Sequence, residues 1–273
     1  MHITIHPFFE STSGSFSFVV ANPESKTCAV IDAALGIAEA DDDMKLNTDC
    51  ADQILDWIDA HGFVARWILE THVHADRPSA SGYLKSKLLC AQTAIGANTP
   101  DVKGYDKLFQ EGDKICLGHT CGRVLETPGH TPGCISYHFE GVLFIGDTLF
   151  MPDTGTARCD FPGGCATTLF SSIQRILSLP GDTRLFVCHD YGVDSSGAPR
   201  RSRFVTTVDE QRRQNIHVGH AAHAASFVNV RSARDATLSA PRWSHFSIPA
   251  NLECMGLKNI DSLMTQSLGS RSH

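Results

Sequence analysis

Residues 71–78 read Thr71-His72-Val73-His74-Ala75-Asp76-Arg77-Pro78. This run matches the metal-binding signature His-x-His-x-Asp-His except at its last position, where Arg77 replaces a histidine that would normally bind a second metal ion. A guanidinium stays protonated in proteins and has no lone pair to offer a metal. The run therefore predicts a site for one ion rather than two, with the guanidinium of Arg77 paired with Asp76.

Further candidate ligands follow this run, each placed just after a predicted strand. They are His130, Asp147 and His189. The strands that precede the candidates are predicted at 64–70, 122–127, 142–145 and 184–188. Loops at strand ends on a rigid scaffold are where reacting groups concentrate. We therefore expect these three residues to share one rim of the fold with His72 and His74.

The apolar patterning predicts two mixed β-sheets packed face to face and covered by outer helices. A hairpin is expected at 15–21 and 27–31, because turn residues at 22–25 separate two alternating runs. Another hairpin is expected at 134–139 and 142–145. Other short strands are expected at 92–95 and 114–117.

Helical spacing is clearest at 51–61 and 167–177. Pro78 suits the first turn of another helix. The apolar residues that this helix would turn inward are Tyr83, Leu84, Leu88 and Leu89. Residues 39–50 are polar and acidic and are expected to form a loop. After Thr206 the pattern predicts only one or two helices.

The composition describes one large globular unit. The chain has 273 residues, of which 42% are hydrophobic, so we expect a single domain over 1–250 with a substantial core and an irregular C-terminal tail over 251–273. A formal net charge of −7 gives no electrostatic reason to expect nucleic acid or an anionic membrane as a partner. No apolar run is long enough to cross a bilayer, so we expect a cytoplasmic protein. The ten cysteines are scattered, and we expect them to be reduced.

Together these motifs resemble the metallo-β-lactamase fold superfamily, and most closely its persulfide dioxygenases and the related β-lactamase-like hydrolases of bacterial sulfur operons. The resemblance spans about Phe8 to Arg242. It implies an α/β (α+β) fold, an αββα sandwich of two mixed sheets flanked by helices. The blocks that carry the resemblance are Glu70-Thr71-His72-Val73-His74-Ala75-Asp76, Thr127-Pro128-Gly129-His130-Thr131-Pro132-Gly133, Phe144-Ile145-Gly146-Asp147-Thr148-Leu149-Phe150, Ala157-Arg158-Cys159-Asp160-Phe161-Pro162-Gly163-Gly164, and Leu179-Pro180-Gly181-Asp182 to Cys188-His189-Asp190-Tyr191.

The resemblance to the persulfide dioxygenases implies one Fe²⁺ per chain and the conversion of glutathione persulfide and O₂ to sulfite and glutathione. The metal-binding and catalytic residues that it implies are His72, His130 and Asp147. Two imidazoles and one carboxylate on one face leave the opposite positions of a non-haem iron open for substrate and oxygen. The resemblance further implies that the ligands and water are held by His74, Asp76, Arg77 and His189, and that Arg158 and Tyr191 contribute to the substrate pocket.

Two other functions remain open at this point. A mononuclear Zn²⁺ site would generate hydroxide and hydrolyse a thioester or a lactone. A non-catalytic protein that binds a persulfide or a metal could use the same residues. The expected partners are a small thiol or persulfide and O₂, and a homodimer is left open.

Overall fold

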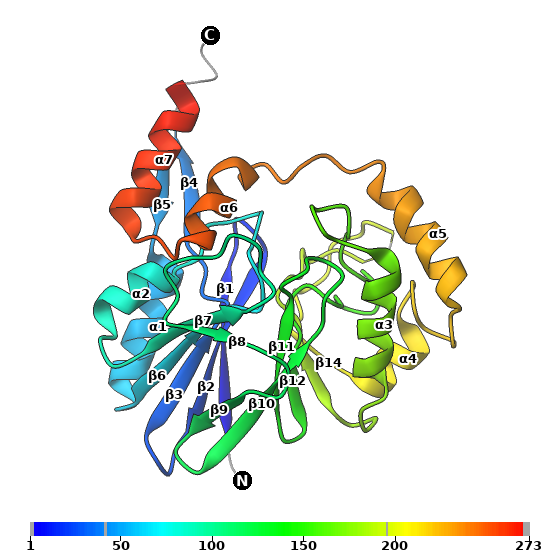
Figure 1. The fold of residues 1–273 in the computed structure, drawn as a ribbon, viewed down its shortest axis with the longest axis horizontal. Coiled ribbons are helices and arrows are strands. Elements are labelled where there is room, and N and C mark those ends of the chain that lie inside the picture. The colour runs from blue at the N-terminus through cyan, green and yellow to red at the C-terminus, as the bar shows by residue number, and fades with distance from the viewer. Residues whose placement is uncertain (1–2, 41–42, 195, 270–273) are drawn as a thin grey trace.

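The computed structural model describes residues 3–40, 43–194 and 196–269. Two six-stranded sheets pack face to face, and helices cover both outer surfaces, as Figure 1 shows. The predicted αββα sandwich is confirmed.

The first sheet combines an antiparallel half with a parallel half. Its strands, in spatial order, are β1 (Thr4–Glu10), β2 (Ser15–Asn22), β3 (Thr27–Ile31), β6 (Val64–Leu69), β7 (Gln92–Gly96) and β8 (Lys107–Phe109). Strands β1, β2 and β3 are antiparallel, which confirms the predicted hairpin, and β3, β6, β7 and β8 run parallel. Apolar side chains from the outer face pack with helices α1 (Asp49–Ala60) and α2 (Ser81–Lys87).

The second sheet is mostly antiparallel. Its strands, in spatial order, are β14 (Val205–Thr207), β13 (Arg184–Phe186), β12 (Val142–Phe144), β11 (Ile135–Phe139), β10 (Thr120–Glu126) and β9 (Lys114–Leu117). Only β12 and β13 pair in parallel. Helices α3 (Ala166–Leu177), α4 (Val208–Gln214) and α5 (Ala224–Asp235) contribute to the apolar cluster on its outer face.

Aromatic rings fill the space between the two sheets. The Phe18 ring on β2 lies 5.3 Å from that of Phe144 on β12 and 5.4 Å from that of Phe186 on β13, measured between centroids. All three side chains are buried. Because these rings come from both sheets, their packing fixes the distance between the strand ends that carry the site.

Three local predictions were wrong. Residues within the expected loop 39–50 form a hairpin of β4 (Gly36–Ala40) and β5 (Asp43–Asn47). Helix α2 begins at Ser81, so Pro78 precedes the helix instead of forming its first turn. Leu89, expected inside, is 81% exposed because α2 ends at Lys87 and the chain turns away.

The C-terminal segment is more regular than expected. Helix α7 (Leu257–Gly269) lies within 251–273, where an irregular tail was predicted, and the preceding helix α6 (Ser244–Leu252) ends just inside that range. Ile260 and Met264, four residues apart on α7, are buried in the core beneath the first sheet. This i, i+4 spacing, with Leu257 and Leu263 packed against the same core, presents one apolar face that the sequence analysis overlooked.

Two cysteines are paired, contrary to the expectation of reduced thiols. Cys116 and Cys121 lie opposite each other on β9 and β10 and form a disulfide. The turn between the strands brings these two residues together, although their spacing matches no familiar cysteine motif. Among the described helices, none has the length and apolar character that spanning a bilayer requires.

We expect Phe18→Ala to lower the free energy of unfolding by about 3–5 kcal/mol, because it empties the space between the sheets. Urea denaturation followed by circular dichroism measures this change. Phe9→Ala is the matched control, since Phe9 is 43% exposed on the adjacent strand and should cost much less. Equal losses in the two variants would contradict the assignment of Phe18 to the central core.

Candidate metal centre

The candidate site lies at one rim of the sandwich, where several strands end. His72 follows β6, His130 follows β10, Asp147 follows β12 and His189 follows β13. Asp32, which follows β3, is linked to the same rim because its carboxylate accepts a hydrogen bond from the backbone of the loop after β6. The structure thus brings together residues that are far apart in sequence.

His72, His130 and Asp147 converge on one point. Asp147 Oδ2 lies 3.7 Å from His72 Nε2 and 3.9 Å from His130 Nε2. One ligand atom from each residue lies within 4.8 Å of the others, so a single metal ion fits between them. Two imidazoles and one carboxylate suit non-haem iron, and zinc accepts the same ligand types.

The hydrogen bonds of both histidines leave Nε2 available. Thr71 Oγ1 donates to the carboxylate of Asp32 over 2.9 Å, so it can only accept from His72 Nδ1, which lies 2.9 Å away. His130 Nδ1 donates to the carbonyl oxygen of Arg158 over 2.6 Å. With Nδ1 protonated, each neutral ring presents an Nε2 lone pair towards Asp147.

Burial sets the charges of this group. It lowers the pKa of His72 well below the ordinary value, and the neighbouring His74 and His130 add to the effect. Burial also lowers the pKa of His130. Burial alone would raise the pKa of Asp147, but the contact with His189 outweighs it and brings that pKa to about 2. At neutral pH the group therefore holds two neutral imidazoles and one carboxylate, the protonation states that metal binding requires.

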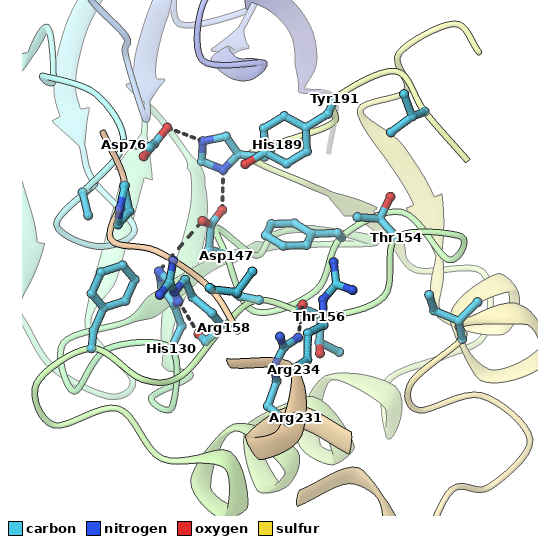
Figure 2. A pocket seen from close by; sticks show the side chains of 18 of the residues that line it. Asp76, His130, Asp147, Thr154, Thr156, Arg158, His189, Tyr191, Arg231 and Arg234 are labelled. Atoms are coloured by element: carbon cyan, nitrogen blue, oxygen red, sulfur yellow. Dashed lines mark hydrogen bonds and ion pairs between the residues drawn. The ribbon is translucent and has the colours of Figure 1, made fainter. Parts of the chain in front are cut away.

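His189 lies between two carboxylates, as Figure 2 shows. Its Nδ1 donates to Asp147 Oδ1 over 2.6 Å, and its Nε2 donates to Asp76 Oδ2 over 2.9 Å. Burial lowers the pKa of His189, but the two carboxylates raise it well above its ordinary value. The side chains of Asp76 and His189 are thus engaged with each other.

A cavity of about 440 Å³ opens beside these residues. Phe150, Phe161 and Tyr191 supply apolar walls, and the Tyr191 ring stacks on His189 with their centroids 6.0 Å apart. The pocket residues predicted from the sequence, Arg158 and Tyr191, both line it. A cavity of this size suits a small-molecule ligand.

Comparison with known proteins identifies the family. A model of the metallo-beta-lactamase superfamily matches residues 12–189. The chain belongs to this superfamily. It is 38% identical to glyoxylase B2 of Dictyostelium discoideum, over 92% of this chain and 89% of that protein. It is 30% identical to the mitochondrial persulfide dioxygenase ETHE1 of Homo sapiens, with the same coverage of 92% and 89%.

Solved structures of the superfamily agree with the fold. The crystal structure of ETHE1 from Myxococcus xanthus matches this structure with a TM-score of 0.77 and 26% sequence identity. The match covers 92% of this chain and 99% of that one. The resemblance inferred from the sequence motifs is therefore confirmed.

Arg77, which departs from the superfamily signature, points into the protein. Its Nε donates to Ser15 Oγ over 2.8 Å, and its terminal nitrogens donate to the carbonyl oxygens of Asp32 (3.0 Å) and Ala33 (3.3 Å). The side chain is 1% exposed. The predicted pairing with Asp76 is wrong, because these neutral acceptors hold the guanidinium and Asp76 instead accepts from His189.

His74 is anchored through one ring nitrogen. Its Nε2 lies 3.1 Å from Glu70 Oε2 and 3.3 Å from Asp32 Oδ1. Its Nδ1 is buried and has no hydrogen-bond partner in the part of the chain that the structure describes. The predicted supporting position of His74 next to the ligands is consistent with its ring, which lies 4.1 Å from that of His72 between centroids.

The sequence analysis did not single out two acids that orient the site. Asp32 accepts hydrogen bonds from Thr71, and Glu70 accepts from Ser79 and Ser81. A signal for Asp32 was present, because it directly follows a predicted strand, as the other site residues do. Glu70 carries no such signal, since its serine partners lie beyond the signature and reach it only through the turn before α2.

We expect Arg77→Met to lower the free energy of unfolding by about 1.5–3 kcal/mol, because hydrogen bonds from a charged donor to buried acceptors are lost. Chemical denaturation measures the change. Arg66→Met is the control, since Arg66 is exposed on β6 and its replacement should cost no more than about 0.5 kcal/mol. An unchanged stability in Arg77→Met would show that the buried guanidinium is not held by these contacts.

Proposed function

We propose that the chain is a mononuclear non-haem iron persulfide dioxygenase, which oxidises the persulfide of a small thiol such as glutathione with O₂. The observation that carries the proposal is the set His72 Nε2, His130 Nε2 and Asp147 Oδ2, with both imidazoles oriented by hydrogen bonds at Nδ1. These three residues would hold the ion from one side. The similarity to the human persulfide dioxygenase ETHE1 supports the reaction type.

In this proposal one persulfide, one O₂ and one water give one thiol, one sulfite and two protons, and the sulfane sulfur supplies the electrons that reduce O₂. Ferrous iron, when bound, would supply the positions at which oxygen and the persulfide sulfur meet and react. The substrate cavity adjoins the open side of the three ligands. Phe150, Phe161 and Tyr191 form aromatic walls of this cavity.

The remaining polar residues hold the ligands in place. Asp147 has one oxygen for the ion, while its other oxygen accepts from His189. Asp76 accepts from the far side of His189 and so fixes the ring. A pair held in this way supports a metal ligand without itself being available to a second ion. This arrangement and the missing histidine at Arg77 favour one ion per chain.

A mononuclear zinc hydrolase is the second candidate, and one structural feature favours it. The buried, unpartnered Nδ1 of His74, among the described residues, would gain a partner if His72, His74 and His130 together held zinc. The similarity to glyoxylase B2 of Dictyostelium discoideum also points to chemistry other than persulfide oxidation. In that case zinc-bound water would attack a thioester or a lactone.

We expect the purified protein, prepared without a metal-binding tag, to contain about one iron per chain, since the two-histidine, one-carboxylate set suits ferrous iron. Elemental analysis measures the metal. His130→Ala and Asp147→Ala should lose it, while His119→Ala, at an exposed position outside the site, should retain it. Two zinc ions per chain, or loss of the metal in His74→Ala to the same extent as in His130→Ala, would favour the zinc hydrolase.

We expect the aerobic protein to take up oxygen in the presence of glutathione persulfide and to form an equal amount of sulfite. The same preparation should not hydrolyse lactoylglutathione, because the proposed ion binds oxygen and sulfur instead of activating water. An oxygen electrode and a sulfite assay measure the reaction. Hydrolysis of the thioester without oxygen uptake with the persulfide would replace the dioxygenase by the hydrolase.

A further inference from the structure

The cavity beside the candidate metal centre is lined by three arginines, two of which are already neutralised. Arg158 donates from Nε and Nη2 to the two carboxylate oxygens of Asp160, over 2.6 Å each, and from Nη1 to the carbonyl of Ser239 over 2.8 Å. Arg231 is buried and forms an ion pair with Asp235 at 2.5 Å. Neither guanidinium is free to bind a ligand.

Arg234 is the exception. It lines the same cavity, is exposed, and forms no side-chain hydrogen bond or ion pair with any residue that the structure describes. Figure 2 shows it beside Arg231, away from Asp76 and His189 at the other side of the view. The cavity that His72, His130 and Asp147 line therefore also has an exposed cationic group, which helix α5 supplies.

The acids of the cavity are engaged with groups other than Arg234. Both carboxylate oxygens of Asp153 accept from Arg200, over 2.6 and 2.9 Å. Asp194 accepts hydrogen bonds from the loop that follows it, at Ser196 and Ala198. Asp76 and Asp147, which also line the cavity, both accept from His189. An exposed guanidinium in a partly apolar cavity is suited to bind an anionic group of a ligand.

Helix α5 holds Arg234 in a fixed relation to the metal ligands. Arg231 Nη1, one turn earlier on this helix, donates to the carbonyl of Thr156 over 3.0 Å. Asp235 accepts from the backbone nitrogen of Cys159 over 2.9 Å. The residue between these two anchor points, Arg158, accepts the hydrogen bond that orients His130. The arginine is thus positioned on a rigid element before a ligand arrives.

We propose that Arg234 binds a carboxylate of the substrate, so that the enzyme selects an acidic thiol carrier over a neutral or cationic one. This inference rests on the proposed function in one respect, that the ligand carries a persulfide. The anion-binding role of Arg234 is argued only from the contacts of the residues that line the cavity. The sequence analysis predicted Arg158 as a residue of the substrate pocket, but its guanidinium is paired with Asp160, so we assign the carboxylate contact to Arg234. The paired guanidinium of Arg158 then shapes the wall of the cavity.

The test compares Arg234→Gln, Arg234→Lys and wild type with two substrates, glutathione persulfide and the persulfide of glutathione dimethyl ester. Arg234→Gln should raise the KM for glutathione persulfide by about 10- to 100-fold with kcat little changed, as expected for one lost hydrogen-bonded charge. Its KM for the ester should match that of wild type. Arg234→Lys should recover part of the loss.

Two controls separate recognition from folding. The metal content of Arg234→Gln should equal that of wild type. Arg213→Gln, at an exposed arginine of α4 that does not line the cavity, should have wild-type KM values for both substrates. Equal changes of KM for the acid and the ester, or a loss of metal in Arg234→Gln, would overturn the inference.

A second measurement tests carboxylate binding by Arg234 independently of the proposed dioxygenase reaction. Calorimetry with S-methylglutathione, which cannot be oxidised as a persulfide, reports binding alone, and wild type should bind it about 10- to 100-fold more tightly than Arg234→Gln. If wild type binds this ligand in that way but takes up no oxygen with either persulfide, the proposed function fails and the carboxylate site stands. If binding does not depend on Arg234, the carboxylate site fails. Turnover of coenzyme A persulfide with the same dependence on Arg234 would assign the site to phosphate and also overturn the proposal.

Discussion

The buried carboxylate of Asp32 is the contact on which the geometry of the site depends. It accepts from the backbone nitrogen of Thr71 over 2.7 Å and from its hydroxyl over 2.9 Å, and so ties the end of β3 to the loop after β6. Burial would raise the pKa of Asp32, but hydrogen bonds from His74 and Thr71 keep it below the ordinary value. Because this carboxylate stays ionised, the Thr71 hydroxyl donates its proton to Asp32 and can only accept a hydrogen bond from His72 Nδ1. His72 is therefore protonated at Nδ1, and its Nε2 lone pair is available as a metal ligand.

Arg77 is compatible with the fold because its surroundings are rich in acceptors. The carbonyl oxygens of Asp32 and Ala33 and the hydroxyl of Ser15 take hydrogen bonds from the guanidinium, which would otherwise be a costly buried charge. Burial lowers the pKa of Arg77, but the neighbouring Cys188, Asp76, Glu70 and Asp32 outweigh this effect and raise that pKa above its ordinary value. A fixed protein cation thus supplies positive charge on the side of the site where the superfamily signature would place a ligand of a second ion.

The sequence predicted the sheets and the convergence of the strand ends well, because both follow from local patterns. Alternating apolar residues and turn residues define the strands, and His72, His130, Asp147 and His189 each follow one of them. The direction of Arg77 could not be predicted in this way, since its acceptors belong to β2 and to the loop after β3, far away in sequence. Arg234 was missed for a related reason. Helix α5 carries a weak apolar pattern, and its place beside the cavity depends on the buried pair of Arg231 and Asp235.

The loop 156–160 joins substrate recognition to metal binding. Its backbone forms hydrogen bonds with α5 at Thr156 and Cys159. Between these two residues, the carbonyl oxygen of Arg158 accepts a hydrogen bond from His130 Nδ1. The side chain of Arg158 is fixed in turn by Asp160, so the residue acts on the site through its backbone. A displacement of α5 would therefore change both the position of the Arg234 guanidinium and the orientation of the His130 ring. Because one short loop carries both constraints, the position of α5 and the orientation of the His130 ring depend on the same five residues of backbone.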